Sequence, residues 1–147
     1  MRTDVFITAI ATFFPNNPVD NESMEDYLGL ISGQHSRVKN IVLRQNGIKN
    51  RYYALTAKQE VTHTNAELAA NSIKSLLGKQ KFPEKEIELL TCATSNADQL
   101  MPSHASMVHG LLKNKPLEIL PVMYPSVKNC LLGYSYRRKK ECGMQCV

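Results

Sequence analysis

Short apolar strands alternate with amphipathic helices along residues 64–120, and this alternation restricts the chain to a small set of folds. Thr64 and Glu67 have the spacing of a capping box, in which a hydroxyl and a carboxylate accept hydrogen bonds from free backbone N–H groups. The sequence predicts that the helix begins there and that Gly78 ends it. The apolar side of this helix is expected to consist of Ala69, Ile73, Leu76 and Leu77.

A second strand is predicted at residues 87–94, followed by a polar loop at residues 95–99. Pro102 opens the next predicted helix, and a third strand begins at residues 117–120. The inward side chains of this helix are expected to be Ala105, Val108, Leu111 and Leu112. With a first strand at residues 5–11, the order predicts an α/β fold with a small, mostly parallel sheet.

The amino-terminal third of the chain gives weaker signals. Residues 5–11 are apolar and β-branched, which favours a buried strand, although a signal peptide is a second reading of the same stretch. Residues 21–31 have helical spacing, with Asn21 or Ser23 as the expected cap. Residues 37–54 are irregular, and Asn46-Gly47 predicts a turn between two short strand-like runs.

Charge is distributed unevenly along the 147 residues. Residues 1–120 hold 13 Lys/Arg and 12 Asp/Glu, whereas residues 121–147 hold five Lys/Arg and one acid. The overall net charge of +5 is therefore a property of the tail and does not indicate a nucleic-acid partner for the rest of the chain. No apolar run reaches the ~20 residues that a membrane span requires, so we expect no membrane span.

General catalytic and metal-binding motifs are largely missing from the sequence. The four histidines (His35, His63, His104, His109) lack ligand spacing, and we expect no metal site. Cys130, Cys142 and Cys146 could supply three thiolates to zinc, but no histidine or CxxC pair accompanies them. The basic run at residues 137–140 could contact phosphate or act as an address, and a solvated charge run is the alternative.

Three segments carry a resemblance to a known family. They are VFITAIATFFP at residues 5–15, IVLRQNGIKNRYYA at residues 41–54 and LLTCATSNADQLMPSHASMVHGLL at residues 89–112. Together they resemble the amino-terminal part of β-ketoacyl-acyl-carrier-protein synthase III-like enzymes of the thiolase superfamily. This resemblance implies an incomplete thiolase-like fold. It covers residues 5–120, which would be about the first third of a family member.

The resemblance implies a reaction in which a Cys at a helix amino terminus takes an acyl group from a thioester and condenses it with a malonyl carrier thioester. Family spacing from Pro102 places that nucleophile near Ser126, and Cys130 lies four residues later in a different context. The His and Asn of the family's second half have no counterpart here. We therefore assign no catalytic residue and expect the chain to be inactive as written.

Two site residues follow from the resemblance. Arg44 stands one residue before the family's arginine that contacts the phosphate of coenzyme A or phosphopantetheine, a place held here by Gln45. An exposed arginine without a ligand is the alternative. Met101 aligns with a residue that the family inserts into the acyl pocket of its partner subunit, and a methionine that fills the core is the alternative.

The tail departs from the family at about residue 120. Reading its possible codons one nucleotide forward forces a Cys at Met123-Tyr124 and another at Met144-Gln145, and permits family-like runs between them. We therefore expect a partial thiolase-like domain at residues 1–120 and an out-of-frame, disordered tail at residues 121–147. We also expect Ile7, Ile10 and the strand at residues 89–92 to face water or to pack imperfectly, because the family's covering strands are absent.

The sequence thus supports a truncated member of this family, which performs acyl-thioester condensation in fatty-acid or polyketide-type biosynthesis. The alternative is a small non-catalytic α/β module that binds an acyl carrier protein or an acidic surface. The family implies acyl carrier protein or coenzyme A thioesters as substrates, a homodimer, no further cofactor, no nucleic acid and a cytoplasmic location.

Overall fold

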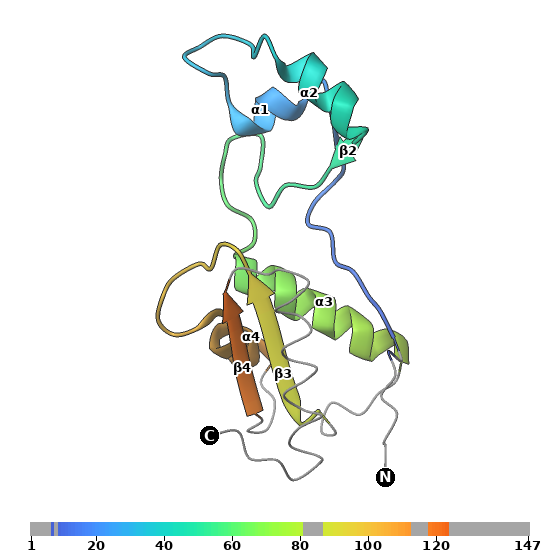
Figure 1. Cartoon of the computed structure of the whole chain (residues 1–147), viewed down its shortest axis with the longest axis vertical. Helices are drawn as coiled ribbons and strands as arrows, with labels where there is room; N and C mark the ends of the chain where they lie inside the picture. Colours follow the sequence, from blue (N-terminus) through green and yellow to red (C-terminus); the bar gives the residue numbers. More distant parts are fainter. Residues whose placement is uncertain (1–6, 8, 81–86, 113–117, 124–147) are drawn as a thin grey trace. The chain divides into compact units, whose positions relative to one another are not determined.

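The computed structural model describes residues 7, 9–80, 87–112 and 118–123 (Figure 1). Two compact units emerge: one is Phe14–Thr64, and the remaining described residues belong to the other. The elements in chain order are β1 (Val19–Asp20), α1 (Met24–Leu28), α2 (Lys39–Asn46), β2 (Asn50–Arg51), α3 (Asn65–Gln80), β3 (Leu89–Thr94), α4 (His104–Leu112) and β4 (Glu118–Met123).

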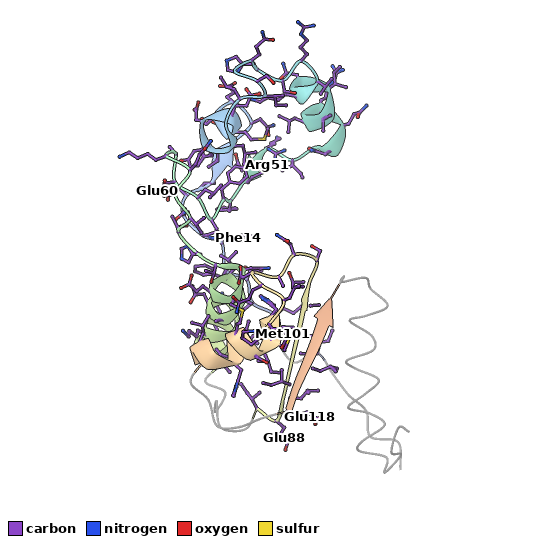
Figure 2. The ribbon with its side chains drawn as sticks, turned by 90° about the vertical axis from the view of Figure 1, so that its left-hand side faces the viewer. Phe14, Arg51, Glu60, Glu88, Met101 and Glu118 are labelled. Carbon is purple, nitrogen blue, oxygen red and sulfur yellow. The ribbon has the colours of Figure 1, made fainter. Side chains whose placement is uncertain are left out.

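The larger unit is built on a parallel strand pair. β3 and β4 pair in register from Leu89 opposite Glu118 to Thr94 opposite Met123, and α4 connects them. Glu88 and Glu118 lie side by side where the pair begins, and the Glu118 N–H donates to the Glu88 carbonyl at 3.0 Å (Figure 2). The predicted parallel strand–helix–strand arrangement is thereby confirmed. β4 continues to Met123, three residues beyond the boundary expected at residue 120.

The core of this unit lies between α3, α4 and one face of the strand pair. Successive side chains of a strand point to opposite faces, so Leu90 and Cys92 are buried while Thr91 and Ala93 are exposed. The expectation that residues 89–92 face water or pack imperfectly is wrong for Leu90 and Cys92, which are buried in a cluster with residues of α3 and α4. The buried residues of this core are Ala66, Ala70, Leu90, Cys92, Ala105, Val108 and Leu112.

Helices α3 and α4 differ in detail from their predicted forms. Gly78 does not end α3, which continues to Gln80 because a glycine in a helix is tolerated where no left-handed turn follows. Leu111, predicted to point inward, is 36% exposed, because the inward stripe of α4 runs through Ala105, Val108 and Leu112. The extents of the two helices otherwise match the apolar periodicity.

The predicted strand at residues 5–11 is not formed by the residues described there. Ile7 and residues 9–11 lie outside any strand, and Ile7 and Ile10 are 84% and 80% exposed. A β-branched run becomes a strand only when a neighbouring strand accepts its backbone hydrogen bonds. The expectation that Ile7 and Ile10 face water is confirmed.

The Phe14–Thr64 unit is mostly loops around two short helices. β1 and β2 form a two-residue antiparallel pair, whereas β3 and β4 are parallel. α1 covers only Met24–Leu28 of the helix predicted at residues 21–31, and the Gly29 N–H donates to the Glu25 carbonyl where it ends.

The predicted turn at Asn46-Gly47 is instead the end of helix α2. Ile41, Val42 and Leu43, expected in a strand-like run, are helical, and only Leu43 of the three is buried. Gly47 has φ of 66°, the left-handed conformation that commonly follows a helix and that glycine adopts at no steric cost. An Asn-Gly pair is typical of either a hairpin turn or a helix end. Here the preceding residues are helical, so the pair ends the helix.

Polar contacts hold this small unit together. The Glu25 carboxylate accepts hydrogen bonds from His35 Nδ1 at 2.7 Å, the Ser36 N–H at 3.0 Å and Lys39 Nζ at 3.1 Å. These contacts tie α1 to the loop before α2. At the other side of the unit, Asn16 Nδ2 donates to the Tyr53 carbonyl at 2.8 Å. The rings of Phe14 and Tyr52 stack with centroids 4.5 Å apart.

Candidate functional site

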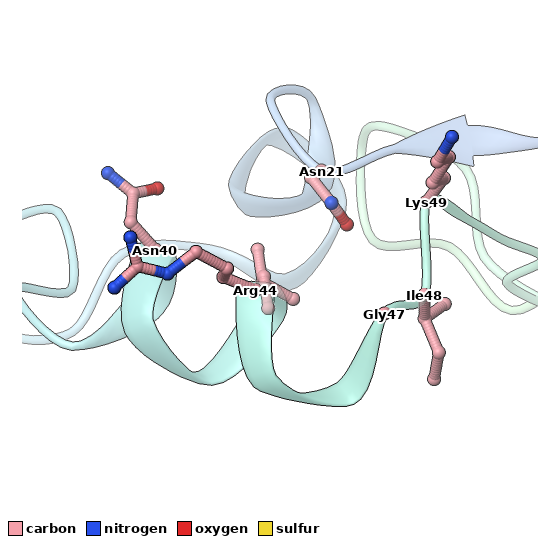
Figure 3. A pocket seen from close by; sticks show the side chains of 7 residues that line it. Asn21, Asn40, Arg44, Gly47, Ile48 and Lys49 are labelled. Carbon is pink, nitrogen blue, oxygen red and sulfur yellow. The ribbon is translucent and has the colours of Figure 1, made fainter.

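A shallow pocket of about 320 Å³ lies beside α2 in the Phe14–Thr64 unit (Figure 3). Its lining combines two cations, two side-chain amides and an apolar part. The lining residues are Asn21, Asn40, Leu43, Arg44, Gly47, Ile48 and Lys49. Arg44, one of the two site residues expected from the sequence, is therefore part of a pocket rather than an isolated surface side chain.

Helix geometry explains how α2 forms one wall of this pocket. Asn40 and Arg44 are four residues apart, so their side chains share one face of the helix. Figure 3 shows their polar ends together at one side of the pocket, with Asn21 between that pair and Lys49. The left-handed Gly47 turns the chain back at the end of α2, which brings Ile48 and Lys49 to the same pocket.

The pocket has a positive electrostatic character. Residues 37–51 contain five Lys/Arg and no Asp/Glu. Lys39 is neutralised by Glu25, with Nζ and Oε2 3.1 Å apart. Arg44 and Lys49, by contrast, form no ion pair with any residue that the structure describes. Two unpaired cations on a concave surface favour an anionic ligand such as a phosphate ester.

Arg51 stabilises the back of the pocket from β2. Its Nη1 donates a hydrogen bond to Oδ1 of Asn21, a residue of the pocket lining. This arginine is the second one of the segment at residues 41–54 that resembles the condensing-enzyme family. It is half-buried, and it contributes to the pocket through Asn21 rather than by lining it.

Met101, the other expected site residue, lies in the larger unit, on the loop between β3 and α4 (Figure 2). Met101 and the preceding Leu100 are 82% and 80% exposed, so Met101 does not fill the core. The loop itself is anchored to α3. The Asp98 carboxylate accepts hydrogen bonds from the Asn65 and Ala66 N–H groups at 2.8 Å each, and Asn65 Nδ2 donates to Thr94 Oγ1 at 2.9 Å.

The other candidates fall into two groups. Ser126, Cys130, Cys142, Cys146 and the basic run at residues 137–140 lie outside the described residues. The histidines do not form a ligand set: within the described ranges, no group of three or more His, Cys, Asp or Glu side chains could hold a metal ion. His35 contacts Glu25, and His104 is buried in α4.

Sequence reasoning did not identify Asn21, Asn40 or Lys49 as pocket residues. The signal for Asn40 was present, because its spacing of four from Arg44 puts both on one face once residues 39–46 are read as a helix. Asn21 and Lys49 could not be found this way, since only the tertiary arrangement brings them to α2.

No protein-family model matches the chain. The solved structures that resemble it include a condensing enzyme and 3-oxoacyl-[acyl-carrier-protein] synthases III. AbyA1, a tetronic acid condensing enzyme, is 21% identical with a TM-score of 0.71, and the match covers 94% of this chain and 40% of AbyA1. The 3-oxoacyl-[acyl-carrier-protein] synthase III from Aquifex aeolicus is 18% identical with a TM-score of 0.65, covering 91% and 39%. OleA from Xanthomonas campestris, solved with lauric acid and lauroyl-CoA, is 19% identical with a TM-score of 0.62, covering 88% and 37%.

At such identities the likeness establishes the fold, and the chain spans about two fifths of the length of these enzymes. No helix in the described part of the chain is long and apolar enough to cross a membrane. Over about two fifths of their length, the chain has the fold of AbyA1 and of 3-oxoacyl-[acyl-carrier-protein] synthase III.

Proposed function

We propose that this chain is a part of a β-ketoacyl synthase III-like enzyme that acts in the cytoplasm on acyl thioesters of coenzyme A or acyl carrier protein. In this proposal, the pocket beside α2 takes the phosphate-bearing end of coenzyme A or phosphopantetheine. The observation that carries it is the pair of unpaired cations, Arg44 and Lys49, at the pocket of a chain with a condensing-enzyme fold.

The chemistry of the lining supports a phosphate ester over a neutral ligand. A guanidinium presents several N–H donors in a fixed plane and binds phosphate oxygens with charge-assisted hydrogen bonds. The side-chain amides of Asn21 and Asn40 add neutral donors, and Leu43 and Ile48 add an apolar part. Such a mixture suits a ligand that joins phosphate groups to an organic moiety.

Calorimetric titration with coenzyme A tests this proposal. The wild-type chain is expected to bind, and Arg44→Gln to bind about 10- to 100-fold more weakly, which is the usual effect of losing a hydrogen bond to a charged group. Arg37→Gln is the matched control, because it removes one cation from the same basic segment outside the pocket lining. Equal losses in both variants would attribute binding to general charge and contradict the proposal.

We assign no turnover to the 147-residue chain alone. The resemblance places the nucleophile near Ser126, and the family's His and Asn have no counterpart in this sequence. Incubation with acyl-coenzyme A and a malonyl carrier thioester is expected to give no condensation product. An acyl adduct on Cys130 in intact-protein mass spectrometry would overturn this assignment.

The change in the sequence near residue 120 is proposed to be a shift of reading frame. Sequencing the gene around that codon tests this point. A long open frame one nucleotide away, which encodes a Cys and later a His and an Asn, is the expected result. Stop codons within a few codons in both other frames would contradict it.

We also propose that the Leu100–Met101 loop contacts a second copy, with Met101 entering its acyl pocket. The exposure of two adjacent large apolar side chains on an anchored loop supports this. A photoreactive benzoylphenylalanine in place of Met101 is expected to cross-link two chains. The same probe in place of Lys58, an exposed residue of the other unit, should not. Equal cross-linking at both positions would argue against a specific contact.

A further inference from the structure

The hydrogen bond between Arg51 and Asn21 fixes the orientation of a pocket amide. A guanidinium has only N–H donors, so the atom that faces Arg51 must be the carbonyl Oδ1 of Asn21. The two hydrogens on Nδ2 of Asn21 are then directed elsewhere. Nδ2 donates to no residue that the structure describes, although Asn21 lines the pocket.

Asn21 does not act as the cap of α1, whose N-cap residue is Ser23 and makes no side-chain cap hydrogen bond. From its sequence position, Asn21 is one of two expected caps of this helix. In the structure, Asp20 Oδ1 accepts hydrogen bonds from the Glu22 N–H at 3.1 Å and the Ser23 N–H at 2.8 Å. These two N–H groups precede α1, and no side chain caps the helix itself. Its one hydrogen bond to a described residue is the one with Arg51.

We propose that Asn21 donates its Nδ2 hydrogens to an oxygen of the bound phosphate ester and that Arg51 is the positioning residue that holds Asn21 in this orientation. This inference rests on the proposed function of the pocket and adds two residues to it. Arg44 and Lys49 supply charge to the pocket, and Figure 3 shows the Asn21 amide between the Asn40–Arg44 side and Lys49.

Asn21→Asp tests the proposal because it keeps the side-chain oxygen that accepts from Arg51 and removes the Nδ2 donor. The carboxylate keeps an acceptor for Arg51, so the variant should remain folded, with an unchanged circular dichroism spectrum. It loses the donor and places a negative charge beside the ligand. We expect affinity for coenzyme A, and for inorganic diphosphate as a second probe, to fall at least 10-fold.

Asn17→Asp is the matched control, because it makes the same chemical and charge change at an exposed position outside the pocket lining. Its affinity should stay close to that of the wild-type chain. Equal affinities of Asn21→Asp and the wild-type chain would overturn the inference and leave the proposed function intact. Binding of diphosphate without coenzyme A would overturn the proposed ligand, and the Asn21→Asp comparison on diphosphate would still decide the inference. No binding of either probe overturns both.

The positioning role of Arg51 has its own readout. In nitrogen–proton spectra, the Asn21 side-chain amide of the wild-type chain should give two well-separated proton signals that shift during titration with coenzyme A. In Arg51→Met the separation between these two proton signals should decrease, and the affinity for coenzyme A should fall. Arg51→Lys should partly restore both the separation and the affinity, because lysine keeps a donor. Unchanged amide signals in Arg51→Met would contradict the assigned role.

Discussion

At the scale of single residues, burial and hydrogen bonding set how side chains of this chain ionise. Cys92 and Glu25 illustrate opposite effects. Cys92 lies in the core against α3 and α4, where burial raises the pKa of its thiol to about 11. Glu25 receives three hydrogen bonds from residues 35–39, and these lower the pKa of its carboxyl to about 2. Each shift has a measurable consequence.

Cys92 should resist thiol reagents in the folded chain. A thiol pKa raised from 9.0 to about 11 reduces the thiolate fraction at pH 8 about 100-fold, and only the thiolate reacts. Alkylation followed by peptide mass spectrometry resolves Cys92 from the other three cysteines. We expect labelling of Cys92 to be at least 100-fold slower in buffer than in concentrated urea. Equal rates in both conditions would show that this core does not form.

Glu25 should make the Phe14–Thr64 unit sensitive to acid. The main cause of its low pKa is the hydrogen bond from the Ser36 N–H, followed by His35 and Lys39. Because the folded-state pKa is below the ordinary value of 4.5, the stabilising contribution is fully present above about pH 4.5 and is lost as the pH falls towards 2. Glu25→Gln should therefore destabilise the unit at pH 6 and have little effect at pH 2.

Nuclear magnetic resonance titration of the Glu25 carboxyl carbon, with urea unfolding at each pH, measures this effect. Glu22→Gln is the control, because the Glu22 side chain is exposed and takes no part in the contacts with residues 35–39. A midpoint near 4.5 for Glu25, or a pH-independent effect of Glu25→Gln, would show that these hydrogen bonds do not persist in solution.

At the scale of elements, helix α3 depends on a residue 33 positions beyond its own start. Asp98 accepts hydrogen bonds from the Asn65 and Ala66 N–H groups, which have no partner within the helix. The same contacts hold the loop that ends in Leu100 and Met101. One carboxylate thus stabilises both the amino terminus of α3 and the shape of the loop.

Asp98→Ala should destabilise the chain by about 1 kcal/mol, within the usual range of ~0.5–2 kcal/mol for losing an N-terminal cap. The stability of Asp98→Asn, which keeps one acceptor oxygen, should lie between that of the wild-type chain and that of Asp98→Ala. Urea unfolding followed by circular dichroism gives the stability, and hydrogen exchange of the Asn65 and Ala66 amides locates the effect. Unchanged exchange at these two amides in Asp98→Ala would rule out the capping role.

At the scale of the whole molecule, much apolar surface is left uncovered among the described residues. Ile7, Ile10, Leu100 and Met101 are each at least 80% exposed. Each large apolar side chain left in water forfeits ~1.5–3 kcal/mol of burial, whereas the net stability of a domain is only ~5–15 kcal/mol. AbyA1 and the Aquifex aeolicus synthase III are more than twice as long as this chain, so their additional segments can provide such cover.

We therefore expect the isolated chain to unfold in a broad transition of low cooperativity and to bind the dye anilinonaphthalene sulfonate in native buffer. Scanning calorimetry and dye fluorescence measure these two properties, and Leu100→Ser combined with Met101→Ser should lower the dye signal. A single sharp transition, with equal calorimetric and van't Hoff enthalpies and no dye binding, would contradict this expectation.

Local patterns in the sequence determined the elements of residues 64–123. Helices α3 and α4 and strands β3 and β4 were predictable, because apolar periodicity and bounding polar residues act within a few positions. The resemblance to condensing enzymes was enough to single out Arg44 and Met101 from the sequence alone. What each of these two side chains contacts could not be read from neighbouring residues.

Only the tertiary structure decided the remainder. Whether Ile7 and residues 9–11 form a strand depends on a neighbour that accepts their hydrogen bonds, and Asn46-Gly47 ends a helix here although the same pair suits a hairpin. Asp98 caps α3 and Arg51 orients Asn21 across separations of 32 and 30 residues. Periodicity and capping preferences act between near neighbours, whereas these contacts exist only after the chain has brought distant residues together.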